Sequence, residues 1–120
     1  MPVYKCSVKG IEPLRLPDLY RVKLSCNDDV SIEVELHEKI MKIRESEEIE
    51  VYIDKNKDKC LQYDFCGRAH VVSITKFEEY YRVILSIAGP LVVIKLKEQP
   101  RSPFKVMNEL YVGIKKLAKD

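Results

Sequence analysis

The chain has 120 residues, of which 46 % are hydrophobic and 33 % charged, and its formal net charge is +2. At this length one domain buries about two thirds of its unfolded surface, so we expect a single domain over residues 1–120. No run approaches the ~18 consecutive apolar residues of a spanning helix, and residues 1–5 lack the apolar core of a secretion signal. We therefore expect a cytoplasmic protein with no membrane partner.

The charges are unevenly distributed along the chain. Residues 1–54 carry twelve acidic and eight basic side chains, a net charge of −4, and residues 55–120 carry seven acidic and thirteen basic, a net charge of +6. Such a split is typical of proteins with partners of opposite charge. Because the charges are dispersed, a solvated surface is the simpler interpretation.

Alternation of apolar and polar residues is the dominant pattern. Successive side chains on a strand point to opposite faces, so this pattern predicts strands with one buried face. It recurs in six segments, at residues 4–8, 20–26, 30–36, 49–53, 81–87 and 92–96. Turn-prone residues 27–29 and 88–90 each separate two such runs, which predicts two hairpins. Pro90 lacks a backbone donor and belongs at a turn or at the first residue of a strand.

Two further segments are less regular. Residues 63–75 mix two strand phases, and Gly67 within them predicts a bulge or a close approach to the backbone. The segment from His37 to Ile43 could form about two helical turns, with Ile40 and Ile43 facing inward. The charged stretch from Asp54 to Lys59 is predicted to be a turn.

The C-terminal segment fits two structures. Apolar residues between Met107 and Leu117 follow the spacing of an amphipathic helix. The same segment is rich in β-prone residues, and Gly113 disfavours a helix interior by about 1 kcal/mol. Periodicity alone favours the helix. Before this segment, Pro100 and Pro103 interrupt any strand.

Seven or eight short strands with few helices predict an all-β fold. A small closed or nearly closed barrel of the oligonucleotide-binding type, with at most short helical turns, leaves few sheet edges exposed. A split β-sandwich is the alternative.

The four cysteines do not form a recognisable metal motif. Cys6, Cys26, Cys60 and Cys66 include no Cys-x-x-Cys pair, so a zinc site is poorly supported and we predict no metal. Cytosolic thiols stay reduced, except in hyperthermophiles. Cys6 and Cys26 share the apolar phase of their strands, and we interpret them as buried thiols that act as small hydrophobic side chains.

The sequence indicates no catalytic site and no cofactor. The two histidines, His37 and His70, lie outside any recognisable catalytic context, and the glycines are too scattered for a phosphate-binding loop. A free single-stranded nucleic-acid-binding barrel stays open, because aromatic side chains including Tyr80 lie near basic ones including Arg82. We interpret Tyr63 and Tyr81, which fit the inward phase, as core residues. A small-molecule-binding barrel lacks a supporting polar cluster.

An ordered set of motifs resembles the RNA polymerase subunit 8 family, which has archaeal and eukaryotic members. Residues 63–65 (Tyr-Asp-Phe), Gly67 and residues 75–79 (Thr-Lys-Phe-Glu-Glu) resemble its signature. Residues 86–93 resemble its glycine-containing turn, residues 110–117 are similar to its last strand, and residues 34–36 and 48–53 fit the same scheme. Pro90 replaces the second glycine of the turn, and the acidic loop of eukaryotic members is reduced to residues 54–59, which favours an archaeal member.

The resemblance implies a barrel without catalytic residues that docks on the outside of the largest polymerase subunit, near the funnel and pore. It also implies a short helical turn near residues 102–107 followed by a strand. Our hypothesis is a non-catalytic structural subunit that braces the largest subunit by burying edge strands and apolar patches. The candidate interface residues are Thr75, Phe77, Glu78, Gly89, Pro90, Val93, Lys115 and Lys116. Direct contact with nucleic acid is left open.

Overall fold

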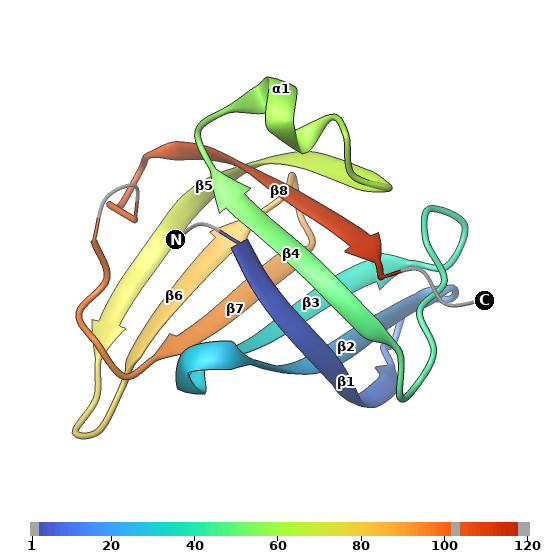
Figure 1. Cartoon of the computed structure of the whole chain (residues 1–120), viewed down its shortest axis with the longest axis horizontal. Coiled ribbons are helices and arrows are strands. Elements are labelled where there is room, and N and C mark those ends of the chain that lie inside the picture. The colour runs from blue at the N-terminus through green and yellow to red at the C-terminus, as the bar shows by residue number, and fades with distance from the viewer. Residues whose placement is uncertain (1–2, 102–103, 118–120) are drawn as a thin grey trace.

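A computed structural model describes residues 3–101 and 104–117 (Figure 1). Most of these residues lie in eight strands. The strands are β1 (Val3–Pro13), β2 (Leu19–Cys26), β3 (Ser31–His37), β4 (Glu48–Asp54), β5 (Phe65–Lys76), β6 (Tyr81–Ser86), β7 (Leu91–Leu96) and β8 (Glu109–Lys116). A 3-10 turn (Asn27–Asp29) and the four-residue helix α1 (Lys57–Cys60) complete the assigned elements. Within these described ranges no helix is long and apolar enough to cross a bilayer.

The eight strands form a closed ring in the order β1-β2-β3-β7-β6-β5-β8-β4, and β4 pairs back onto β1. Every neighbouring pair is antiparallel. The predicted all-β barrel is therefore confirmed, and closure of the ring excludes the split sandwich. Figure 1 shows β1 and β4 in front of β3, β7 and β6.

Inward-facing apolar side chains fill the barrel. On β3, Ile32, Val34 and Leu36 are buried, and their register partners on β2 include Val22 opposite Val34. Burial of each such side chain contributes about 1.5–3 kcal/mol. The period-two pattern is therefore sufficient to identify the buried face of this hairpin from the sequence.

The hairpin between β6 and β7 has the predicted tight turn. Ala88 and Gly89 have φ angles of 53° and 123°, and the N–H of Ile87 donates to the carbonyl of Pro90 at 2.8 Å. Two central residues with positive φ match the twist of the adjoining strands, as in type I′ turns. Pro90 directly precedes β7, as predicted for a residue without a backbone donor.

The strand irregularities agree in part with the sequence prediction, since one of them falls within residues 63–75. The register shifts between Val8 and Gly10 and between Val71 and Ser73, whereas β5 and β8 stay in register at Gly67. A Cβ atom at Gly67 would lie 2.8 Å from Cγ2 of Ile87. A close approach to the backbone, and not a bulge, therefore requires this glycine.

The helix expected between His37 and Ile43 is wrong. The N–H groups of Ile40 and Met41 both donate to the carbonyl of His37, forming a turn, and Ile40 is 60 % exposed. The phenol of Tyr20 donates to the carbonyl of Met41 and accepts from the N–H of Ile43. These tertiary hydrogen bonds hold the segment over one end of the barrel in a non-helical path.

Two other local predictions need correction. The stretch expected to be only a charged turn contains α1, whose first turn is capped by Asn56 accepting from the N–H of Lys59 at 3.1 Å. The C-terminal helix favoured by periodicity is wrong, because β8 pairs with both β4 and β5. Of the expected helical turn, residues 102–103 lie outside the described residues, and Lys105 to Asn108 form a single hydrogen-bonded turn.

The cysteines are paired and not reduced, contrary to expectation. Cys6 and Cys26 are register partners on β1 and β2 and form one disulfide. Cys60 and Cys66 form the second, which links α1 to the start of β5. Strand register brings the first pair together, and the sequence spacing does not reveal that register.

Candidate protein-binding site on the outer wall of the barrel

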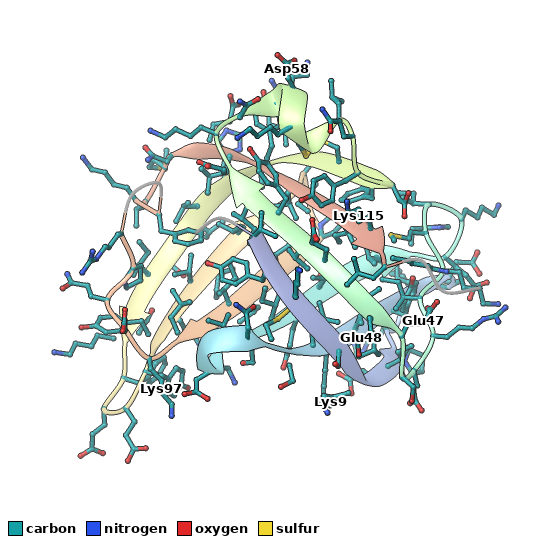
Figure 2. All side chains as sticks on the ribbon, in the orientation of Figure 1. Lys9, Glu47, Glu48, Asp58, Lys97 and Lys115 are labelled. Carbon is teal, nitrogen blue, oxygen red and sulfur yellow. A yellow bond between two sulfur atoms is a disulfide. The ribbon has the colours of Figure 1, made fainter. Side chains whose placement is uncertain are left out.

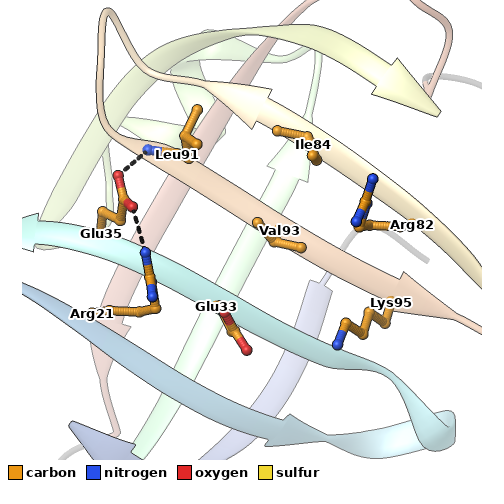
Figure 3. A pocket seen from close by; sticks show the side chains of 8 residues that line it. All are labelled: Arg21, Glu33, Glu35, Arg82, Ile84, Leu91, Val93 and Lys95. Carbon is orange, nitrogen blue, oxygen red and sulfur yellow. Dashed lines mark hydrogen bonds and ion pairs between the residues drawn. The ribbon is translucent and has the colours of Figure 1, made fainter. Parts of the chain in front are cut away.

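A pocket of about 290 Å³ lies on the outer wall of the barrel, across β2, β3, β7 and β6 (Figure 3). We call it the outer pocket. Its lining residues are Arg21, Glu33, Glu35, Arg82, Ile84, Leu91, Val93 and Lys95. They occupy the strand positions that alternate with the buried core residues, so their side chains point away from the barrel interior.

At the first end of the outer pocket, where Arg21 and Glu35 lie, each charged side chain has a partner within the chain. The guanidinium of Arg21 contacts Glu12 at 2.9 Å and Glu35 at 3.0 Å, and Glu35 also accepts the N–H of Leu91 at 3.0 Å. The hydrogen bond to Glu35 is the largest cause that raises the pKa of Arg21, so it favours the charged guanidinium. The charges at this end are already compensated within the chain.

The second end combines two cations with two aromatic rings. Phe77 and Tyr80 stack with centroids 4.8 Å apart, in the short loop between β5 and β6. The guanidinium carbon of Arg82 lies 5.0 Å from the Phe77 centroid, and the ammonium of Lys95 lies 5.6 Å from that of Tyr80. Such contacts orient a cation without neutralising its charge.

Among the described residues, no carboxylate forms an ion pair with Arg82 or Lys95. The Nε atom of Arg82 is buried and has no hydrogen-bond partner among the described residues. Buried polar atoms in proteins are nearly always hydrogen-bonded. Because no described carboxylate pairs with Arg82 or Lys95, the positive charge at this end is uncompensated and can attract an anionic group.

An apolar floor connects the two ends. Ile84 on β6 pairs with Val93 on β7, and Leu91 is the first residue of β7. All three line the pocket. All three side chains are only partly buried, although their positions face outward. An apolar floor rimmed by charges is typical of a protein–protein interface.

Six of the eight predicted interface residues lie on or beside this wall. Thr75 pairs with Arg82, and Phe77 and Glu78 belong to the loop at the second end. Val93 lies in the floor. The turn at residues 89–90 directly precedes Leu91, at the first end.

The remaining two predicted residues are held elsewhere. The ammonium of Lys115 lies 5.0 Å from the Tyr63 ring centroid and 3.7 Å from Glu50, and Lys116 is 3.6 Å from Glu47. Figure 2 shows Lys115 on β8 near α1, on the opposite side of the view from Lys97, which follows β7. Lys115 and Lys116 therefore do not belong to the outer pocket.

Sequence reasoning misses most of the pocket lining. In the sequence, Arg21, Glu33 and Glu35 are only the polar phase of their strands. A usable signal is present in β6 and β7, where Ile84 and Val93 make the outward face apolar as well. Apolar residues on both faces of a strand indicate a covered outer surface.

Tyr63 lies outside the barrel, contrary to the prediction of a core residue. A Cβ atom at Gly113 would lie 2.9 Å from Cγ of Tyr63, so the ring packs directly on the β8 backbone. The hydroxyl of Tyr63 donates to Glu50 at 2.7 Å, and its ring lies 5.5 Å from that of Tyr52. Burial raises the pKa of Tyr63, and the bond to Glu50 raises it further.

The two histidines have separate local partners. Nδ1 of His37 accepts the N–H of Lys39 at 3.0 Å, and Nε2 of the exposed His70 lies 3.5 Å from Glu109. Across the described residues, no group of three His, Cys, Asp or Glu side chains is placed to hold a metal ion.

Comparison with known families gives a match over residues 1–117 to the RpbG family of DNA-directed RNA polymerase subunits. The chain belongs to this family. Its relatives include DNA-directed RNA polymerase subunit Rpo8 of Saccharolobus solfataricus, 29 % identical over 95 % of this chain and 92 % of that protein. Rpo8 of Sulfolobus acidocaldarius is 28 % identical over 94 % and 96 % of the two chains.

A structural comparison finds the molybdate-bound form of the cytoplasmic molybdate-binding protein ModG. The match covers 94 % of this RpbG-family chain and 89 % of the ModG chain, at 12 % identity and a TM-score of 0.41. A score of this size does not establish a shared fold.

Proposed function

We propose that this RpbG-family protein is a non-catalytic, structural subunit of the archaeal DNA-directed RNA polymerase and that it docks on the largest polymerase subunit. The observation that carries the proposal is the family match over residues 1–117. Relatives in two archaeal genera bear the name of the same polymerase subunit. The protein acts in the cytoplasm, during transcription.

The outer pocket is the docking face that the geometry favours. The ring leaves little strand edge for the partner to bury, because each of the eight described strands is paired on both sides over part of its length. Docking therefore depends on side chains on the outer wall. The apolar floor around Ile84 and Val93 supplies surface to bury, and the charged ends supply orientation.

The subunit contributes no catalytic group of its own. His37 and His70 are each held by a different local partner, and neither lines the outer pocket. General acid–base chemistry needs a base within hydrogen-bond reach of a reacting group. The separation of the two histidines is consistent with our proposal that the polymerase reaction belongs to its other subunits.

Free nucleic-acid binding is the second candidate, and the aromatic geometry counts against it. A base needs an accessible ring face for stacking. Phe77 and Tyr80 stack on each other and carry Arg82 and Lys95 against them, and the Tyr63 ring carries Lys115. These rings lack the open faces of a stacking platform.

Affinity purification from cells of the source organism tests the proposal. An affinity-tagged chain should recover the large polymerase subunits, the largest among them, in salt that disrupts weak charge contacts. Binding of the isolated chain to a single-stranded oligonucleotide, with steep salt dependence and no recovery of polymerase, would establish the rival function instead.

A further inference from the structure

The second end of the outer pocket carries positive charge that the described residues do not neutralise. Arg21, at the first end, has two carboxylate partners within 3.0 Å. Among the described residues, Arg82 and Lys95 have aromatic partners and no carboxylate partner, and Nε of Arg82 is buried without an acceptor. An arginine in that state has lost water and gained no hydrogen bond at that atom.

The nearby carboxylates do not neutralise the positive charge of Arg82 and Lys95. Glu33 lines the same pocket opposite Val93, and Glu78 and Glu79 form the adjoining loop. None of the three is within ion-pair distance of Arg82 or Lys95. Figure 3 shows Arg82 and Lys95 at one end of the lining and the Arg21–Glu35 pair at the other.

We propose that this end of the pocket binds an aspartate or glutamate side chain of another polymerase subunit, and that Ile84 and Val93 bind an apolar side chain beside it. This inference rests on the proposed function and specifies its contact. A guanidinium donates two parallel hydrogen bonds to one carboxylate. Contact with Phe77 fixes the guanidinium before the partner arrives, so less entropy is lost on binding.

A single carboxylate fits this site better than a nucleic-acid strand does. A phosphate chain running along the wall from Arg82 would next meet Glu33, which repels it. One acidic side chain needs only the cationic end. The adjoining floor of Ile84, Leu91 and Val93 is suited to an apolar residue and offers a phosphate nothing.

Site-specific photo-crosslinking in the assembled polymerase identifies the occupant. A photoreactive phenylalanine analogue at Val93 should cross-link to a peptide of another subunit that contains an aspartate or glutamate within a few residues. The same analogue at Leu61, which is 59 % exposed and follows α1, should not label that peptide. Cross-links from Val93 to nucleic acid alone, or to no other chain, would overturn the inference.

Charge variants test the cationic end itself. The double variant R82Q/K95Q should bind polymerase depleted of this subunit about tenfold or more weakly than the unchanged protein, because the partner carboxylate stays buried and unpaired. The control K97Q removes an exposed cation that lies 3.6 Å from Asp29 and should bind normally. Equal binding by the double variant, with normal thermal unfolding, would refute the carboxylate contact.

The two proposals fail in different ways. If the unchanged protein does not bind the depleted polymerase, the proposed function is wrong. If it binds and either the R82Q/K95Q result or the Val93 result is negative, only the carboxylate contact is wrong. Should R82Q/K95Q not fold, the cross-linking result from Val93 decides.

Discussion

Tyr20 links the barrel wall to the loop that covers one end of it. Its side chain is buried, and its hydroxyl bonds the backbone at both Met41 and Ile43. The side chains of Met41 and Ile43 are themselves buried. One phenol on β2 therefore determines the path of a segment whose sequence pattern suggests a helix.

Removal of this hydroxyl should destabilise the fold. We predict that Y20F lowers the free energy of unfolding by about 1–3 kcal/mol, because a buried carbonyl and a buried N–H lose their partner. Urea unfolding followed by circular dichroism measures the change. Y111F is the matched control, since Tyr111 is half-buried on β8, outside the core, and the loss of its hydroxyl should change stability little.

Three tyrosines make the protein sensitive to alkaline pH. Burial is the largest cause of the raised pKa of Tyr20, Tyr52 and Tyr63. A pKa that is higher in the folded state contributes stability below the unfolded value of about 10 and loses it as pH rises through the folded value. The free energy of unfolding should therefore be constant from pH 7 to about pH 9 and fall above about pH 10.

Replacement of one tyrosine checks this assignment. Y63F removes a hydroxyl that is half-buried and bonded to Glu50, so the decline above pH 10 should become shallower. Chemical unfolding at a series of pH values measures the slope. An identical slope in Y63F would show that Tyr63 does not contribute to the alkaline transition.

At the scale of elements, two glycines on strands have different roles. A Cβ at Gly113 would lie 2.9 Å from the Tyr63 ring, whereas a Cβ at Gly10 would meet only Cδ of Lys23 at 4.0 Å. We predict that G113A costs about 1–3 kcal/mol, because the ring must move off the strand. G10A should change stability by at most about 0.5 kcal/mol. Thermal unfolding of the two variants compares them, and equal costs would mean that Tyr63 adjusts freely.

The disulfides tie neighbouring elements together. Cys6 and Cys26 are separated by 20 residues and Cys60 and Cys66 by 6, so the first closes the longer loop. Chain-entropy reasoning gives about 3 kcal/mol for the first bridge and about 2 kcal/mol for the second. Thermal unfolding with and without a reductant should show a lower midpoint when both are reduced. An unchanged midpoint, with thiol titration showing four free cysteines beforehand, would mean that the bridges do not form.

The limits of sequence reasoning are clearest at this scale. Alternation identifies most of the strands because one face of each is buried, as in β3. It cannot give the register that pairs Cys6 with Cys26, because register depends on distant strands. It favours a helix for β8, since helical and strand spacing both fit the segment around Gly113. The outer pocket forms where four strands meet. In the sequence, it is indicated only by Ile84 and Val93, which are apolar residues on the outward-facing side of their strands.

At the scale of the whole molecule, closure of the barrel determines how the protein can bind a partner. Each of the eight described strands has two neighbours, so little strand edge is left to extend a partner's sheet. The acidic first half and basic second half of the chain meet where β3 pairs with β7, on the outer wall, and where β4 pairs with β8. The closed ring therefore supports the proposal that a partner binds through side chains on the outer wall.

Polymerase purified through a tag on its largest subunit tests the central claim most directly. Native mass spectrometry of that preparation should show one copy of this chain per largest subunit, and controlled dissociation should yield a subcomplex of these two proteins. A polymerase that is complete and active in transcription but contains none of this chain, although the chain is abundant in the same cells, would contradict the account.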